Sequence, residues 1–238
     1  TLKEIGEHVF SGDSFTGELK LPEGLEEIGE YCFGVNHGFY GELKLPSHLK
    51  KLGANAFCGC SNLTGNLVIP QTITSIPAEA FKSCGFDGNL QLHNGIITIG
   101  EEAFSWCSFR GELILPKDLQ TISPKCFYGN DFSGELKLPK NLVNIGKRAF
   151  ACNGRLTGTL EIPEDVANIG AGAFAQCKSL ETIILPSSLE TIAYENDSYN
   201  HEGGAFEDCF GINSIVCKGT MPPDIQSGAF NGVAKDNF

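Results

Sequence analysis

The sequence predicts an α/β repeat solenoid with a repeat of 23 or 24 residues, a single domain over residues 1–238, and two markers support this prediction. The first marker is a phenylalanine with that spacing, except for one step of 32, at Phe10, Phe33, Phe57, Phe81, Phe104, Phe127, Phe150, Phe174, Phe206 and Phe230. The second marker is a proline, replaced once by His93, at Pro22, Pro46, Pro70, Pro116, Pro139, Pro163 and Pro186. Because both markers keep one period along nearly the whole chain, we expect about nine repeats in one continuous array.

Segments of the type Gly-Glu-Leu-Lys-Leu-Pro alternate polar and apolar residues, which predicts strands with one buried face. About 18 residues connect one such segment to the next, a length that returns the chain to the same side and makes neighbouring strands parallel. The proline that follows lacks a backbone donor and helps to end the strand. We therefore expect nine parallel strands, centred near residues 19, 43, 67, 90, 113, 136, 160, 183 and 215.

The residues after each proline bring further apolar side chains inward and end on the recurring phenylalanine, as Leu25, Ile28 and Phe33 do. We expect each phenylalanine ring to be almost fully buried. A glycine follows the aliphatic residue in the column Gly29, Gly53, Gly100, Gly146 and Gly170. It indicates a tight or positive-φ backbone rather than a long helix, so we expect single-turn or 3-10 helical pieces on this outer side.

The third residue after the recurring phenylalanine is Asn, Asp or Cys in the nine units from Phe10 to Phe206. We call this the Asn/Cys column, and it comprises Asp13, Asn36, Cys60, Cys84, Cys107, Asn130, Asn153, Cys177 and Cys209. Small side chains that form hydrogen bonds suit a turn whose backbone groups point inward and need partners. We expect these side chains to form a continuous stack along the coil.

The ten cysteines fit repeat columns better than a disulfide framework. Five lie in the Asn/Cys column, Cys32 and Cys126 replace a buried alanine, and Cys217 replaces a strand leucine, so we expect buried free thiols there. Cys58 and Cys152 fit no column and are the candidates for oxidation.

Composition and motifs disfavour several classes of function. The net charge of −12 argues against nucleic acid and anionic lipid as partners, because both are bound by clustered Lys and Arg. The sequence lacks a run of 18 apolar residues, so we expect no membrane insertion within this fragment. Since no catalytic, phosphate-binding or metal-binding motif is present, we expect neither enzyme activity nor a cofactor. The first residues already lie inside a repeat, so we expect any targeting or anchoring segment outside the fragment.

The outward strand face contains one candidate binding surface. Glu and Lys two residues apart pair along this face near its ends, which is typical of a solvated sheet. Val68, Gln91, Ile114 and Ile184 depart from that pattern. A contiguous apolar patch would mark an interaction site, whereas isolated apolar residues would need no explanation.

An insertion at residues 194–203 is the second candidate surface, because insertions in solenoids map to one face and are often functional. Tyr194 and Tyr199 could contact a partner, and the neighbouring carboxylates could hold Ca²⁺. A solvated loop without a ligand is the alternative. The last repeat, residues 212–238, is also atypical and is expected to start a cap.

The repeated pattern, written with x for any residue as LxxIGxxAFxxCxxLxGxLxLP, resembles the BspA-like leucine-rich repeat family along essentially the whole chain. The resemblance implies a right-handed leucine-rich-repeat horseshoe or arc with a parallel β-sheet on the concave face and short turn segments on the convex face. It also implies a secreted or cell-surface protein, typically bacterial, that takes part in adhesion and binds a protein or glycan of a host or neighbouring cell. The alternative is a structural spacer that displays other domains of a longer surface protein. A monomer is favoured in either case.

Overall fold

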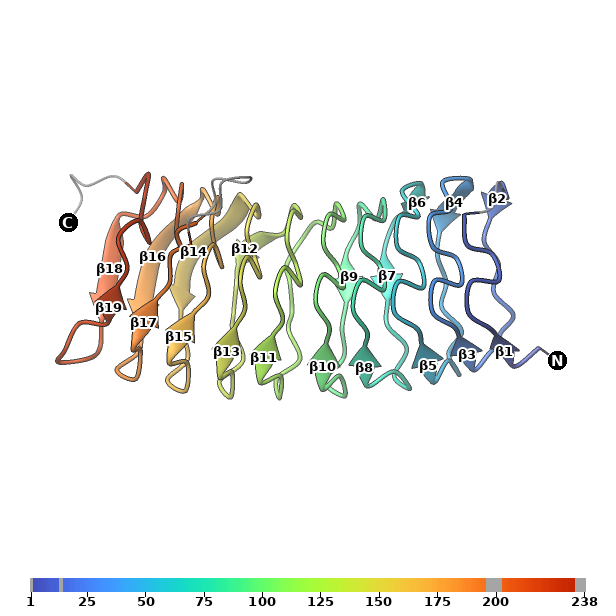
Figure 1. The fold of residues 1–238 in the computed structure, drawn as a ribbon, viewed down its shortest axis with the longest axis horizontal. Coiled ribbons are helices and arrows are strands. Elements are labelled where there is room, and N and C mark those ends of the chain that lie inside the picture. Colours follow the sequence, from blue (N-terminus) through green and yellow to red (C-terminus); the bar gives the residue numbers. More distant parts are fainter. Residues whose placement is uncertain (1, 13–14, 196–202, 234–238) are drawn as a thin grey trace.

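The computed structural model describes residues 2–12, 15–195 and 203–233. These residues form a row of coils, one for each repeat, stacked along the long axis of the molecule (Figure 1). β1 lies near one end of the row and β19 near the other. Every pair of named strands is parallel and joins neighbouring coils, which confirms the predicted solenoid of parallel strands.

The predicted strand segments form one side of each coil, which we call the first ladder. It consists of β2 (Gly17–Glu18), β4 (Phe39–Glu42), β6 (Leu63–Thr64), β7 (Leu67–Val68), β9 (Leu90–Gln91), β12 (Ser133–Glu135), β14 (Arg155–Glu161), β16 (Leu180–Leu185) and β18 (Ser214–Cys217). The ladder divides into the sheets β2-β4-β6, β7-β9 and β12-β14-β16-β18. The strand predicted near residue 113 is not found, because residues 111–116 form no ladder pairs, although Leu113 is still buried.

A second ladder, which the sequence analysis did not predict, lies where each repeat carries its Ile or Leu before the glycine. It consists of β1 (Glu4–Ile5), β3 (Glu27–Ile28), β5 (Lys51–Leu52), β8 (Ser75–Ile76), β10 (Thr98–Ile99), β11 (Thr121–Ile122), β13 (Asn144–Ile145), β15 (Asn168–Ile169), β17 (Thr191–Ile192) and β19 (Asp224–Ile225). These strands have two residues each, which is too short for an alternating pattern to reveal them. The side chains expected to turn inward, such as Leu25 and Ile28, are fully buried.

The outer segments that end on the recurring phenylalanine are turns. The described residues contain no helix, so the expected 3-10 pieces and the α part of the fold class are not found. The phenylalanine amide donates to the next coil instead, as Phe57 N does to Ala80 O at 2.9 Å. The residue two positions earlier has a left-handed backbone, with φ between 50° and 56°, at His8, Tyr31, Asn55, Glu79, Glu102, Lys125 and Arg148. A left-handed residue interrupts a right-handed helix, so these segments stack as turns.

The glycine column is explained by close approach between coils and not by a positive φ. Gly29 and Gly53 lie outside the left-handed region. A Cβ on Gly29 would lie 2.4 Å from the carbonyl carbon of Gly6, and one on Gly53 would lie 2.3 Å from the backbone nitrogen of Glu30. The tight backbone expected there is confirmed, and its cause is steric.

Two columns of aromatic rings form the core. The recurring phenylalanines stack nearly parallel, with ring centroids 5.1 to 5.8 Å apart. The expected burial is confirmed from Phe33 to Phe206, while Phe10 and Phe230 at the two ends are half-buried. A second column, which the sequence analysis missed, includes Phe86, Phe109 and Phe132 and packs edge-on against the first.

The Asn/Cys column satisfies backbone carbonyls between coils, as expected. The thiols of Cys60 and Cys84 donate to the carbonyls of Phe33 and Phe57, one coil earlier, at 3.1 and 3.0 Å. Asn153 donates both to Phe127 O at 2.9 Å and to Phe150 O at 2.8 Å. Burial raises the pKa of Cys60 to about 12, so its thiol stays protonated at neutral pH and remains a donor. Asp13 lies outside the described residues.

All ten cysteines are free thiols, including Cys58 and Cys152. The expectation of a buried side chain is wrong for Cys217, which is exposed. Cys217 ends β18, in the atypical region near the last coil, where residues 216–222 are mostly exposed and provide little cover.

Candidate functional site

The exposed side of the first ladder changes in character along the row of coils. The last coils carry Thr159 with Glu161, Thr182 with Ile184, and Ser214 with Val216. In three earlier coils, Glu and Lys two residues apart form ion pairs. These are Glu18 with Lys20 at 3.2 Å, Glu42 with Lys44 at 3.4 Å, and Glu135 with Lys137 at 3.9 Å. The three coils between them carry Asn66 with Val68, Asn89 with Gln91, and Glu112 with Ile114 at the same two positions. We call these six residues the central window.

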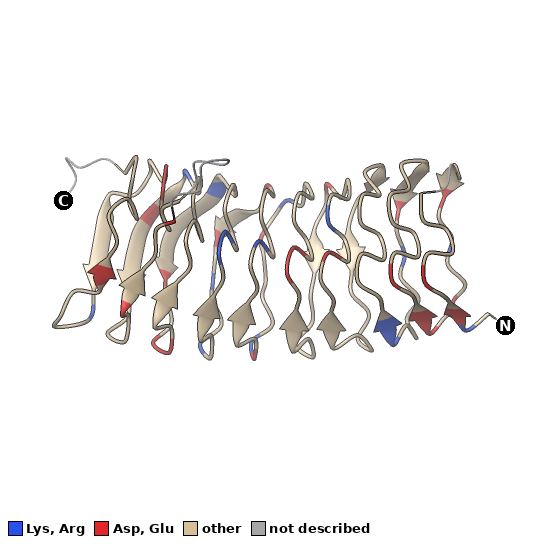
Figure 2. Ribbon diagram, viewed as in Figure 1, with Lys and Arg blue, Asp and Glu red and all other residues tan. Residues whose placement is uncertain are grey.

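The central window combines exposed apolar side chains with polar ones, of which only Glu112 is charged. Val68 is 52% exposed and Ile114 is 65% exposed, while Gln91, which is directly paired with Val68, is also exposed. The strands β7 and β9 contain no charged residue, whereas β4, β12 and β14 each contain a glutamate (Figure 2). The side chain of Asn66 accepts a hydrogen bond from Asn89 N at 2.7 Å, so it links two coils of the window. Removing water from this surface therefore costs less free energy than removing it from the Glu–Lys pairs on either side.

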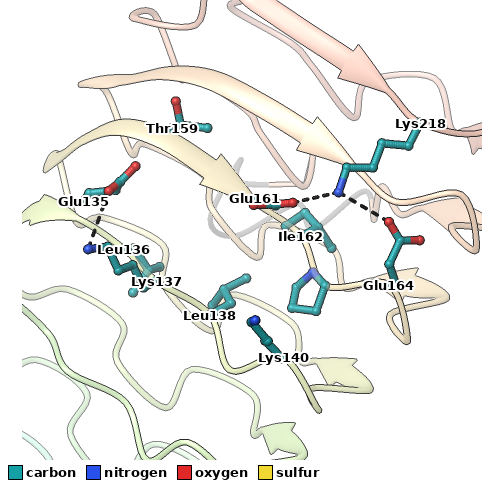
Figure 3. Close-up of a pocket in the computed structure, with 11 residues that line it drawn as sticks. Glu135, Leu136, Lys137, Leu138, Lys140, Thr159, Glu161, Ile162, Glu164 and Lys218 are labelled. Atoms are coloured by element: carbon teal, nitrogen blue, oxygen red, sulfur yellow. Dashed lines mark hydrogen bonds and ion pairs between the residues drawn. The ribbon is translucent and has the colours of Figure 1, made fainter.

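Two grooves cut into this face at equivalent places in the repeat. The N-terminal groove, about 480 Å³, is lined by Glu42, Leu43, Lys44, Leu45, Ser47, Asn66, Val68, Ile69, Pro70 and Gln71. The C-terminal groove, about 620 Å³, is lined by Glu135, Leu136, Lys137, Leu138, Lys140, Thr159, Glu161, Ile162, Pro163, Glu164 and Lys218 (Figure 3). Apart from Lys218, each residue of the C-terminal groove lies 93 positions after its counterpart, as Glu135 does after Glu42.

The two grooves have the same apolar floor but different walls. Glu161 and Glu164 of the C-terminal groove replace Val68 and Gln71. Lys218 reaches from a later coil to both carboxylates, with Nζ 2.7 Å from Glu161 Oε1 and 3.4 Å from Glu164 Oε1 (Figure 3). Hydrogen bonds from Ser187, together with Lys218, lower the pKa of Glu164, and the Glu161 carboxylate raises the pKa of Lys218. The walls of the C-terminal groove are thus occupied by an internal ion pair.

The structure brings together some of the candidate residues and separates others. Val68, Gln91 and Ile114 share the central window. Ile184 lies on β16, half-buried, paired with Glu161 on one side and Val216 on the other. Neither the role of Lys218 nor the groove that it lines was predicted. Lys218 is 57 positions from Glu161, and no local sequence pattern relates the two residues.

Tyr194 and Glu195, the first residues of the insertion, follow β17 of the second ladder. Tyr194 is half-buried and bridges to Gly204, and Glu195 forms an ion pair with Lys147 at 2.7 Å. Tyr199 lies outside the described residues.

Neither metal-binding nor membrane-spanning features are found within residues 2–12, 15–195 and 203–233. That part of the chain contains no group of three or more His, Cys, Asp or Glu side chains placed to hold a metal ion. It also contains no helix with the length and apolar character needed to cross a bilayer.

Comparison with known proteins gives a family and a fold. The family model described as BspA type Leucine rich repeat region matches residues 1–110 and 97–234, with six copies. A leucine-rich repeat protein from Bacteroides ovatus ATCC 8483 has a similar structure, with a TM-score of 0.56 and 23% identity, over 90% of this chain and 64% of that one. This chain thus spans less than two thirds of that protein, and the likeness concerns the fold.

Two further solved structures match at lower similarity. A leucine rich cell surface protein from Faecalibacterium prausnitzii A2-165 has 18% identity and a TM-score of 0.33, over 92% of this chain and 83% of that one. The pneumococcal vaccine antigen PcpA has 18% identity and a TM-score of 0.42, over 99% of this chain and 69% of that one. A search of curated proteins returned no match.

Proposed function

Since the chain belongs to the family with the BspA type leucine rich repeat region, we propose that it is a non-enzymatic recognition module of a secreted or cell-surface protein. It binds a protein or glycan of a host or neighbouring cell through the exposed face of the first ladder. The proposal treats residues 1–238 as one monomeric solenoid domain of about nine repeats, right-handed and curved so that the first ladder lies on the concave face.

The central window is the observation that carries this proposal. Val68 and Ile114 are more than half exposed in a stretch of the face that is flanked by the ion pairs Glu42–Lys44 and Glu135–Lys137. Exposed apolar residues that lie together and are rimmed by polar groups are typical of interaction sites. The N-terminal groove, which lies beside Val68, adds a concave surface to the same window. These features give a partner an apolar centre and a charged rim.

The test is a binding screen of the purified chain against arrays of host extracellular-matrix proteins and of glycans. The double variant Val68→Lys with Ile114→Lys is screened in parallel, and circular dichroism verifies its fold. We expect at least one partner that binds the wild-type chain and is lost in the variant. A partner that binds both proteins equally would place recognition outside the window.

A structural spacer is the second candidate function. The Glu–Lys ion pairs of the first ladder favour it, because solvated pairs such as Glu18 with Lys20 need no partner. Under this alternative the chain displays other domains of a longer surface protein. It predicts that neither the wild-type chain nor the variant binds any component of the arrays.

A further inference from the structure

Trp106 is the single tryptophan of the chain, and it lies on the turn side of the coil, away from the central window. The column it occupies, two residues after the recurring phenylalanine, otherwise contains Gly12, Val35, Gly59, Ser83, Gly129, Cys152, Gln176, Asp208 and Gly232. The tryptophan is 55% exposed. The exposed indole contributes little to the core, and it is a larger aromatic surface than any other residue of this column offers.

The indole is held in a fixed orientation. Trp106 has a left-handed backbone with φ of 53°, and its backbone N–H donates to the carbonyl oxygen of Tyr128 at 2.7 Å. The ring leans over the following coil, because a Cβ on Gly129 would lie 2.7 Å from Trp106 Cε3 and 3.0 Å from Cδ2. The Tyr128 ring meets it edge-on, with centroids 4.9 Å apart and an interplanar angle of 85°. Glycine at 129 thus provides the space in which the indole lies.

The coil before that of Trp106 carries a small residue in this column. This residue is Ser83, joined to the Trp106 coil by the hydrogen bond from Ser83 N to Ser105 O at 2.8 Å. One side of the ring rests on Gly129 and Tyr128, while more than half of the residue remains exposed. A flat aromatic face is therefore available.

Charged side chains of the same and neighbouring coils are already paired. Lys82 lies 2.8 Å from Glu79 and also forms an ion pair with Glu102, and Lys125 lies 2.9 Å from Glu102. Arg110 and Asp131, on the same and the following coil, approach to 4.0 Å. An anionic ligand would have to break one of these pairs to obtain a cation, whereas hydroxyl groups can bond to the paired ions without separating them.

We propose that Trp106 is a stacking platform for a neutral pyranose sugar, with Gly129 and Tyr128 as the residues that position it. The C–H groups on one face of a pyranose pack against the electron-rich face of an aromatic ring. The hydroxyl groups at the edge of the sugar can then form hydrogen bonds with the polar side chains nearby. A protein partner would need a wider apolar patch than this one, since the adjacent Ser83, Ser108 and Gly129 are not apolar anchors. This site is independent of the proposed first-ladder surface.

Intrinsic fluorescence tests the proposal directly, because all tryptophan emission comes from Trp106. The chain is titrated with neutral hexasaccharides made of glucose, mannose or N-acetylglucosamine, and with a polygalacturonate hexasaccharide as the anionic probe. We expect saturable quenching or a blue shift with at least one neutral probe. Calorimetric affinity for that probe should fall at least tenfold in Trp106→Ala and less in Trp106→Phe.

The matched control is Tyr40→Ala, which removes an equally exposed aromatic residue, 55%, from the first ladder and should leave the affinity for the sugar unchanged. Absence of any saturable change with all the neutral probes would overturn the proposal. It would also be overturned if the anionic probe alone bound, or if Trp106→Ala kept wild-type affinity. Loss of sugar binding in Trp106→Ala together with unchanged array binding would separate this site from the central window.

Discussion

The two grooves on the first ladder show how one repeated backbone can present two different surfaces. Their floors are equivalent, since Leu43 and Ile69 in one correspond to Leu136 and Ile162 in the other. Their walls differ, because the N-terminal groove has Val68 where the C-terminal groove has Glu161, and Lys218 neutralises the latter from a later coil. The buried columns therefore define the scaffold, and the exposed columns define what each groove can bind.

Removing a ring from the shared scaffold has the largest expected effect. Phe127→Ala opens a cavity in a fully buried column between the two grooves, so we expect a loss of about 3–5 kcal/mol in the free energy of unfolding. Equilibrium denaturation measures it. Phe210→Ala, which removes a ring that is largely exposed, is the control and should cost far less. A loss below about 1 kcal/mol for Phe127→Ala would mean that the column is not the common core.

The Asn/Cys column offers a smaller test of whether the two halves share one scaffold. Asn153→Ala removes one side-chain donor from each of the carbonyls of Phe127 and Phe150, which keep only the longer bonds from Asn130 and Cys177, and this should cost about 1 kcal/mol. Asn153→Cys should cost less, because cysteine makes the bond to the preceding coil at Cys60 and Cys84 in the N-terminal half. Thermal and chemical denaturation of the two variants compare these losses. Equal losses would show that the two residue types are not interchangeable.

Exchanging the walls tests the difference between the grooves. The double variant Val68→Glu with Gln71→Glu gives the N-terminal groove the carboxylates of the C-terminal one, without a lysine to pair them. We expect binding of a first-ladder partner to weaken about tenfold, equivalent to about 1.4 kcal/mol, and stability to change by less than about 0.5 kcal/mol. Surface plasmon resonance measures the affinity. Unchanged affinity would remove the N-terminal groove from the binding surface.

The smallest expected effect concerns the ion pairs that Lys218 forms on the wall of the C-terminal groove. The pKa of Glu164 is lowered by Ser187 first and then by Lys218, so Lys218→Met should return it part of the way toward its ordinary value. A carboxylate with a lowered folded-state pKa stabilises the protein above its unfolded pKa, and this contribution is lost as the pH falls through the folded value. Below the folded-state pKa of Glu164, the free energies of unfolding of the variant and the wild-type chain should therefore become similar. Carboxyl NMR titration of Glu164 would contradict this if its pKa did not rise.

The buried part of the fold could be predicted from sequence because each column repeats one type of side chain at a fixed spacing. Leu43 and Phe127 recur as apolar residues at fixed spacing, and Asn153 and Cys60 share a small side chain that donates a hydrogen bond. The second ladder could not be predicted in the same way, since two residues per coil contain no period. Single-turn or 3-10 pieces were expected on the outer side because the glycine column indicated a tight backbone. The left-handed conformation found there instead, as at Lys125, is not marked by residue type.

The candidate site could be predicted only where it follows a column. Val68, Gln91 and Ile114 stood out because they interrupt a repeated Glu–Lys pattern. The contact of Lys218 with Glu161 depends on how distant coils align and has no sequence signal. The fixed orientation of Trp106 was equally hidden, because it depends on Gly129 in the following repeat.

The most direct test of the account is the affinity of a partner found on the arrays for the variant Val68→Lys with Ile114→Lys. The control Thr182→Lys with Ser214→Lys adds the same two charges to the same face, on paired residues outside the central window. We predict at least a tenfold loss in the window variant and little change in the control, with both folds intact by circular dichroism. Equal affinity of the window variant and the wild-type chain would contradict recognition through the central window.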